Sequence, residues 1–296
     1  MVPLWMYPLA IACGNTFILK PSERDPSSTL LIAQLFHDAG LSKGVLNVVP
    51  GDKIAVDALI EVPEVKALSF VGSTPIAEYI YTEGTRRGKR VQALGSAKKH
   101  AVVMPDADLD NTVNALMGAA YGSCGERCMV ISVAVCVGDQ VDDALIAKLM
   151  PQIKALKIGA STERGLDKGP LVTRAHMDKV IGYVNAGVEA GASLVVDGWD
   201  LKVPGHEKGF FIGGCLFDHV TTDQTICKEE IFGPMLCIVR VNSLEEQYDA
   251  LVRFSEFSTP PAEHRLLIHC LTETTLIFMM DDIRQFHAVS RAHFME

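Results

Sequence analysis

Cys128 is the residue of this 296-residue chain whose surroundings most favour nucleophilic chemistry. It closes a Gly-Glu-Arg-Cys segment at 125–128, in a turn of small residues ahead of an apolar run at 130–137. A thiol beside an arginine such as Arg127 ionises more readily, and the thiolate is the form that attacks electrophiles. A buried structural cysteine fits the same local pattern, and Cys124 fits that alternative better than Cys128 does.

Two predicted strands end in residues that can hold a phosphate or a sugar. Gly72 and Ser73 follow one strand and precede a helix, whose N-terminal amides and positive dipole end attract phosphate. Lys20 and Glu23 follow another strand, where a lysine and a carboxylate can contact ribose hydroxyls. A plain strand-to-helix turn and a solvated ion pair remain the alternatives for these two pairs.

A carboxylate pair, Glu229 and Glu230, stands ahead of an Ile-Phe-Gly-Pro segment at 231–234. Paired carboxylates can act as general acid and general base. A solvated acidic pair at a turn fits the same residues, so the local pattern leaves both interpretations open.

Composition restricts the class of protein. The chain is 48% hydrophobic and 21% charged, as soluble globular proteins are, and its length suggests about two domains. The net charge of −9 argues against a nucleic-acid partner. No apolar run approaches the ~18–20 residues of a membrane span, and the chain opens without the basic start of a secretory signal. We expect a small-molecule substrate, with neither nucleic acid nor membrane as a partner.

The eight cysteines form no recognisable metal or disulfide pattern. No pair has CxxC spacing, and no histidine cluster lies near Cys124 and Cys128 to complete a zinc site. Reduced thiols are the default for such a chain, so we expect a cytoplasmic protein without a bound metal. Four of the nine histidines follow Pro260 and Pro261. Their irregular spacing favours an incidental segment over a metal-binding tail.

Strand and helix signals alternate along the chain, which predicts parallel strands covered by helices and hence an α/β fold. The expected domains are a cofactor domain at 1–104, a catalytic domain at 105–250 and an atypical tail at 251–296. Apolar runs predict strands at 16–19, 45–49, 67–71, 91–94, 102–104, 130–137, 194–196 and 236–241. Helical periodicity predicts helices near 30–39, 55–60, 75–81, 109–121, 141–156 and 173–190.

Taken together, these segments resemble the aldehyde dehydrogenase superfamily in order and rough spacing over about residues 2 to 250. The resemblance rests on the segments at 14–23, 44–49, 70–74, 125–128 and 229–234. It narrows to the CoA-acylating methylmalonate-semialdehyde dehydrogenases through the segments at 2–8, 95–100, 117–123 and 125–129. The implied fold is a partial Rossmann-type cofactor domain joined to an α/β catalytic domain.

That resemblance implies an enzyme that oxidises malonate or methylmalonate semialdehyde with NAD and coenzyme A. The products are acetyl-CoA or propionyl-CoA and CO2, in valine and inositol catabolism. Cys128 would be the nucleophile, and Arg127 would pair with the substrate carboxylate, hold the loop or bias Cys128 toward thiolate. The implied cofactor contacts are Lys20 and Glu23 to the adenosine ribose, Gly72 and Ser73 to the pyrophosphate, and Glu230 and Phe232 around the nicotinamide ribose.

One departure from the wider superfamily concerns deacylation. Hydrolytic relatives carry a glutamate before Leu-Gly-Gly that activates water, whereas this chain has Gln-Ala-Leu-Gly-Ser at 92–96. A thiol needs less help than water does, so the missing carboxylate favours transfer to coenzyme A. Ser96 and Lys99 replace the branch's usual Gly and Asn beside the expected nicotinamide pocket.

Further departures concern the ends of the resemblance. The chain begins just after the family's Pro-Phe-Asn or Pro-Trp-Asn segment, whose Asn helps form the oxyanion hole, and the likeness stops near residue 250. We expect a truncated copy of a longer enzyme, whose full-length relatives form homo-oligomers. The alternatives are an inactive or partner-dependent fragment and a hydrolytic aldehyde dehydrogenase.

Overall fold

The computed structural model describes residues 2–138, 140–243, 245–246 and 276–279. The described chain forms two compact units, Met1–Ser96 and the part from Ala97 onward, and each is described here by itself. The predicted division at 104 differs from this boundary, because the strand at 99–103 pairs with strands of the second unit. Most of the predicted tail, with its four histidines, lies outside the described residues.

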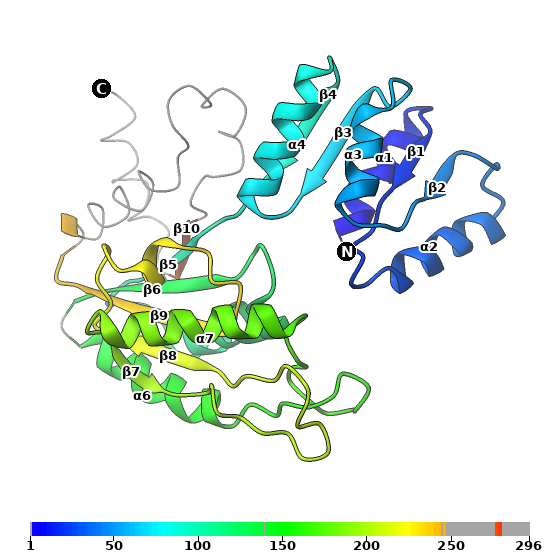
Figure 1. Cartoon of the computed structure of the whole chain (residues 1–296). Helices are drawn as coiled ribbons and strands as arrows, with labels where there is room; N and C mark the ends of the chain where they lie inside the picture. The colour runs from blue at the N-terminus through cyan, green and yellow to red at the C-terminus, as the bar shows by residue number, and fades with distance from the viewer. Residues whose placement is uncertain (1, 139, 244, 247–275, 280–296) are drawn as a thin grey trace. The chain divides into compact units, whose positions relative to one another are not determined.

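The first unit contains two separate pairs of parallel strands (Figure 1). β1 (Phe17–Leu19) pairs with β2 (Leu46–Val48), and β3 (Ala67–Val71) pairs with β4 (Arg90–Leu94). All four strands lie where the apolar runs predict them. The alternating pattern predicts parallel strands but does not specify which strands become neighbours. It therefore does not predict that these four strands form two separate two-stranded sheets.

Helices connect these strands. Asp52 begins one of them as its N-cap, with its carboxylate accepting a hydrogen bond from the Ile54 amide at 3.0 Å. Ser73 is the extended N-cap residue of the helix that follows β3. The helices of the first unit are η1 (Val2–Trp5), α1 (Tyr7–Ala12), α2 (Ser27–Asp38), α3 (Lys53–Glu61) and α4 (Thr74–Arg86).

The second unit is built on one six-stranded sheet with the order β10-β5-β6-β9-β8-β7. Its strands run parallel except β7, which is antiparallel to β8. Every residue of β5 and β6 is buried, which explains why β6 is almost continuously apolar, whereas β5 begins with the polar residues Lys99 and His100. The strands are β5 (Lys99–Val103), β6 (Ile131–Val137), β7 (Ser193–Val196), β8 (Cys215–Asp218), β9 (Met235–Val241) and β10 (Leu276–Met279).

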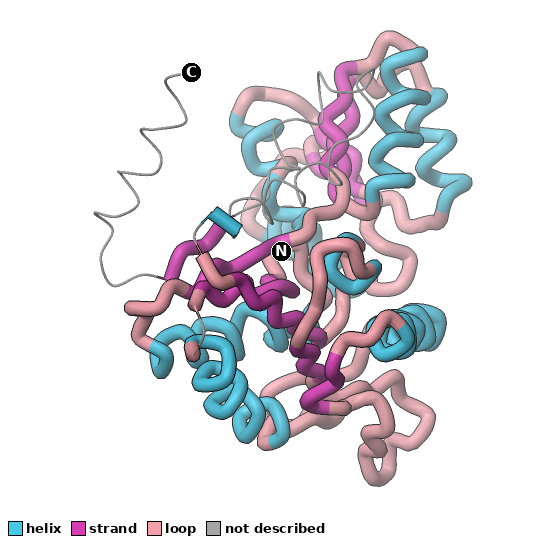
Figure 2. Tube along the Cα trace, turned by 90° about the vertical axis from the view of Figure 1, so that its left-hand side faces the viewer, coloured by secondary structure: helices cyan, strands magenta, loops and turns pink. Residues whose placement is uncertain are grey.

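Helices pack on both faces of this sheet (Figures 1 and 2). Alternate strand residues join two hydrophobic clusters, one shared with α7 (Arg174–Glu189) and the other with α5 (Leu109–Leu116) and α6 (Val141–Lys154). α8 (Thr225–Lys228) is a short helix before β9. The sheet is therefore a layer between helices, the α/β architecture that the sequence predicts.

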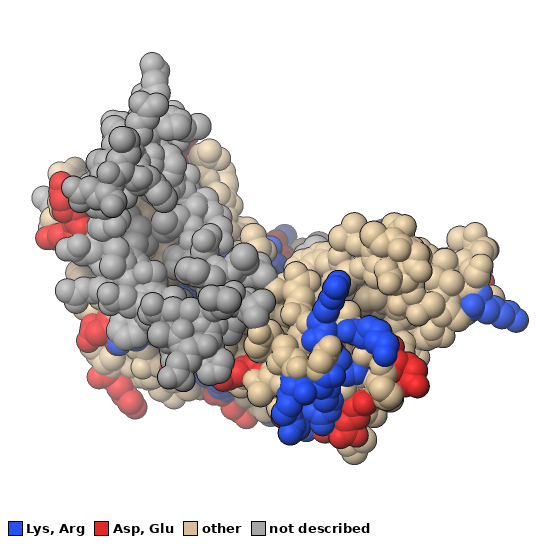
Figure 3. All heavy atoms as spheres, turned by 90° about the horizontal axis from the view of Figure 1, so that it is seen from above, with Lys and Arg blue, Asp and Glu red and all other residues tan. Residues whose placement is uncertain are grey.

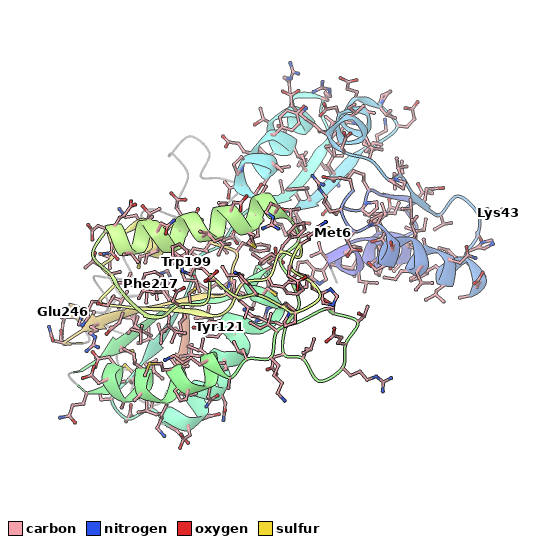
Figure 4. The ribbon with its side chains drawn as sticks, turned by 60° about the horizontal axis from the view of Figure 1, so that its bottom comes forward. Met6, Lys43, Tyr121, Trp199, Phe217 and Glu246 are labelled. Atoms are coloured by element: carbon pink, nitrogen blue, oxygen red, sulfur yellow. The ribbon has the colours of Figure 1, made fainter. Side chains whose placement is uncertain are left out.

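The helix predicted over 109–121 is regular only as far as Leu116. It continues as a π-helical turn, η2 (Met117–Tyr121), and a 3-10 turn, η3 (Gly122–Gly125). Tyr121 is fully buried inside the second unit (Figure 4), and its hydroxyl donates to the Cys215 carbonyl at 3.0 Å. This bond anchors the segment that leads to the predicted nucleophile.

Charges of both signs mix on the face in Figure 3. In the first unit, Glu83 of α4 pairs with both Arg86 and Arg87. Among the helices of the described ranges, none combines the length and apolar character needed to cross a bilayer.

Candidate active site

The turn that carries Cys128, called here the cysteine turn (residues 122–128), has an unusual backbone. Ser123 and Cys124 adopt left-handed φ values of 52° and 58°, and Gly125 follows at 71°. Left-handed conformations are costly for non-glycine residues and persist where the surroundings enforce them. One such constraint is the Cys124 thiol, which lies 2.8 Å from the Gly169 carbonyl that accepts its hydrogen bond.

A second segment, called here the acidic loop (residues 229–234), backs the cysteine turn. A Cβ atom on Gly125 would collide with the carbonyl group of Gly233, so only glycine fits there. Phe232 has a left-handed φ of 57°. The two segments, about a hundred residues apart in sequence, are therefore in direct backbone contact within the second unit.

Cys128 is partly exposed and has charged groups of both signs near it. Burial and the Glu230 carboxylate raise the pKa of its thiol, while a backbone hydrogen bond and the Lys99 ammonium act in the opposite direction. Lys99 is only 7% exposed, and burial lowers its own pKa. Cys128 is thus a weakly acidic thiol, chiefly because of burial, and Glu230 and Lys99 shift the pKa of that thiol in opposite directions.

The paired carboxylates have different partners. Glu229 accepts a hydrogen bond from the Tyr183 hydroxyl at 2.6 Å, which ties it to α7. Glu230 accepts one from the Ala97 amide at 3.3 Å and acts on Cys128. The two carboxylates therefore differ in role: Glu229 is bonded to α7, whereas Glu230 interacts with Cys128.

Arg127 is turned toward the protein backbone. Its Nη2 donates to the Gly118 carbonyl at 2.6 Å and to the Ala119 carbonyl at 3.1 Å, both in the π-helical turn η2. Its guanidinium thereby links the cysteine turn to the segment that precedes it. This geometry matches the loop-holding alternative considered for Arg127.

His176 and Glu126 complete the site. No local sequence pattern connects them. His176 Nε2 lies 2.6 Å from the Phe232 carbonyl oxygen and 3.6 Å from Glu126 Oε1. Glu126 also accepts a hydrogen bond from the Val172 amide at 3.2 Å, and burial raises its pKa. His176 and Glu126 lie 50 positions apart in sequence, so no spacing motif joins them.

The other predicted ligand-binding residues lie in the first unit. Lys20 Nζ donates to the Gly51 carbonyl at 2.7 Å and lies 3.6 Å from the Glu23 carboxylate. Gly72 and Ser73 form the turn between β3 and α4. The structure therefore brings each pair together within its own turn.

The turn at Gly72 and Ser73, the predicted phosphate site, lies at the N-terminus of α4. A Cβ on Gly72 would approach the Phe70 ring to 2.5 Å, so a larger residue there would displace this ring. The Thr74 amide donates to the Ser96 hydroxyl at 3.2 Å, and the Ser96 amide donates to the Thr74 hydroxyl at 3.0 Å. These two bonds fix the start of the thirteen-residue helix α4, whose second residue is a proline and whose Ile76 amide donates to the Ser73 carbonyl at 3.1 Å.

Metal ligation finds no support in the described ranges: no group of three or more His, Cys, Asp or Glu residues is placed to bind an ion. The seven cysteines of the described ranges are free thiols. The side chains described at the site are a thiol, three carboxylates, a lysine, an arginine and a histidine.

Known proteins resemble this chain in sequence and in fold. The model of the aldehyde dehydrogenase family matches residues 1–251. Malonate-semialdehyde dehydrogenase of Pseudomonas aeruginosa is 80% identical over 246 residues, which are 83% of this chain and 50% of that protein. The chain thus spans about half the length of the curated relatives it matches.

Two solved structures are close in fold. Methylmalonate-semialdehyde dehydrogenase from Oceanimonas doudoroffii has a TM-score of 0.88 at 53% identity, over 98% of this chain and 56% of that one. A protein from Sinorhizobium meliloti 1021, provisionally named methylmalonate-semialdehyde dehydrogenase and solved with NAD, has a TM-score of 0.88 at 47% identity. That comparison also covers 98% of this chain and 56% of the other.

Proposed function

Because the chain belongs to the aldehyde dehydrogenase family, we propose that it oxidises malonate or methylmalonate semialdehyde to acetyl-CoA or propionyl-CoA with release of CO2. The observation that carries the proposal is Cys128, a partly exposed thiol at the end of a strained turn, on which the charges of Lys99 and Glu230 act in opposite directions. The names of its relatives support the semialdehyde as substrate. A place in valine and inositol catabolism belongs to the same proposal.

NAD is the proposed oxidant, and when bound it accepts the hydride. Its pyrophosphate is proposed to lie at the turn of Gly72 and Ser73, beside the N-terminus of α4 with its positive dipole end. Lys20 and Glu23 are the proposed contacts of the adenosine ribose. In the second unit, Glu230 and Phe232 are the proposed neighbours of the nicotinamide ribose.

Cys128 performs the covalent chemistry in this proposal. Its thiolate attacks the aldehyde carbon, and the resulting thiohemiacetal loses a hydride to leave a thioester on sulfur. The β-carboxylate then leaves as CO2, and the electron pair of the broken bond takes up a proton. Lys99 supports this sequence because its ammonium favours the thiolate, both before attack and when sulfur leaves.

Coenzyme A is the proposed acceptor of the acyl group. Its thiolate attacks the thioester carbonyl, and Cys128 departs as the thiolate that began the cycle. Position 93 is Ala, where hydrolytic relatives of this family carry a water-activating glutamate. Thiolysis needs no such base, which is the reason for preferring coenzyme A over water.

The experiment follows NADH absorbance with malonate semialdehyde and NAD, with and without coenzyme A. We expect turnover that requires coenzyme A and disappears in Cys128→Ser but not in Cys13→Ser, whose exposed thiol lies in the first unit. Turnover without coenzyme A would favour the hydrolytic alternative. A folded protein that forms no NADH in either mixture would favour the inactive or partner-dependent alternative.

Arg127 has two proposed roles, anchoring the cysteine turn and pairing with the substrate carboxylate. Its two bonds to main-chain carbonyls support the first. Assembly into homo-oligomers and a cytoplasmic location complete the proposal, and both rest on the family resemblance and the cysteine usage alone.

A further inference from the structure

One face of α7 braces the acidic loop at three successive positions. His176 reaches the Phe232 carbonyl oxygen, and Tyr183 donates to Glu229. Between them, Val180 packs so closely on Gly233 that a Cβ there would approach its methyl carbon to 2.7 Å. Spacings of four and three residues place His176, Val180 and Tyr183 on one side of a helix. The loop is therefore held along its length by α7.

His176 differs from the other two because it also reaches the cysteine turn. Its Nε2 lies 3.6 Å from the carboxylate of Glu126, two residues before Cys128. A carbonyl oxygen only accepts hydrogen bonds, so the 2.6 Å contact with Phe232 requires that Nε2 carry the proton. One N–H group thus faces acceptors from both segments of the site.

The backbone of His176 is fixed as well. Thr173 caps α7, and its hydroxyl accepts the His176 amide hydrogen bond at 3.1 Å. The imidazole also meets the Phe232 ring edge to face, with ring centres 6.1 Å apart. Phe232 itself is held at a left-handed φ of 57°. The His176 N–H group and the Phe232 carbonyl that accepts its hydrogen bond are thus both held in fixed positions.

We infer that His176 is a positioning residue. Its hydrogen bond to the Phe232 carbonyl holds the acidic loop where Gly233 contacts Gly125, and this contact positions Cys128. Its consequence for turnover rests on the proposed function. No contact with substrate is assigned to His176. Removing its N–H group frees the Phe232 carbonyl, and the contact between loop and turn loosens.

Three substitutions separate the hydrogen bond from the bulk of the ring. His176→Gln keeps an N–H donor at the position of Nε2, whereas His176→Asn is one bond too short and His176→Leu has no donor. We expect the pre-steady-state burst of NADH to slow about tenfold in the Leu and Asn variants and less than about threefold in the Gln variant. Asp178→Asn, an exposed position on the same helix, is the control and keeps the wild-type burst.

A second readout does not need turnover. Iodoacetamide should modify Cys128 about threefold faster in His176→Leu, because the burial that suppresses its ionisation is relaxed. The exposed Cys13 is an internal reference whose rate stays constant. His176→Gln should resemble wild type in this measurement too.

The outcomes separate the two proposals. A wild-type chain that forms no NADH overturns the proposed function, and the alkylation rates then decide the inference alone. In an active enzyme, a burst unchanged in His176→Leu, or equally slowed in the Leu and Gln variants, overturns the role of His176. If the Leu variant does not fold, the comparison of Gln with Asn decides in the same way.

Discussion

Gly125 and Gly233 meet backbone to backbone, and a Cβ on Gly125 would occupy the position of the Gly233 carbonyl group. Gly125 also has a φ of 71°, which side chains larger than hydrogen disfavour. The contact joins the cysteine turn to the acidic loop. It makes the position of Cys128 depend on a segment about a hundred residues further along the chain.

Gly125→Ala should therefore lower the free energy of unfolding by more than about 2 kcal/mol and abolish turnover, since both the clash and the backbone conformation oppose the methyl group. Urea denaturation measures the first effect and NADH formation the second. Gly182→Ala is the matched control, because Gly182 lies within α7 and has open space around its Cα. Equal stability of the two variants would contradict the tight contact.

The opposing charges around Cys128 predict opposite effects on its reactivity. Lys99→Asn removes a cation and should raise the pKa of the thiol further, while Glu230→Gln removes an anion and should lower it. Alkylation of Cys128 near pH 8 should become about three- to tenfold slower in the first variant and faster in the second. In every variant the rate should rise with pH as the thiol ionises. Mass spectrometry of the Cys128 peptide over a pH series measures the shift, and identical profiles would contradict it.

Arg127→Lys tests which role the guanidinium performs. Lysine cannot reproduce the planar donor geometry that reaches the carbonyls of Gly118 and Ala119, so the cysteine turn should loosen. We expect kcat/KM to fall for malonate semialdehyde and for uncharged propanal alike, with their ratio changed less than about threefold. A loss confined to malonate semialdehyde would instead assign Arg127 to the substrate carboxylate.

Arg240 on β9 binds a group of three carboxylates. It lies 2.6 Å from Asp218, 2.9 Å from Asp142 and 2.8 Å from Asp143, and the first two aspartates are buried. Arg240→Met removes the arginine partner of those two buried carboxylates and should cost about 3–5 kcal/mol of stability at neutral pH. Urea denaturation checks this, with Arg164→Met, at an exposed position in a loop, as control.

The same group predicts how that cost depends on pH. Burial alone would raise the pKa of Asp218, but the hydrogen bonds from Arg240 outweigh it and hold the pKa below its ordinary value. The stabilisation is therefore complete above the aspartate pKa of the unfolded chain and is lost as pH falls through the lower, folded value. The stability difference between wild type and Arg240→Met should narrow in acid. A difference that stays constant with pH would contradict this coupling.

Local sequence by itself determined the elements and the identity of the site segments. Apolar runs mark β1 to β7 and β9, and the Gly-Glu-Arg-Cys and Glu-Glu-Ile-Phe-Gly-Pro segments mark the family. These signals are readable because a strand, a helix start or a tight turn is dictated by neighbouring residues. β8 is not predicted, because its four residues follow a glycine pair and are too few to show the alternation or apolar run of a strand.

Tertiary structure alone decided which of these segments touch. β5 joins the sheet of the second unit, Glu229 and Glu230 take different partners, and Arg127 donates to backbone carbonyls. His176 was beyond sequence reasoning because its partners, Glu126 and Phe232, lie 50 and 56 positions away. Contacts at such separation depend on how the sheet and α7 pack, and packing is a property of the whole unit, not of any local stretch.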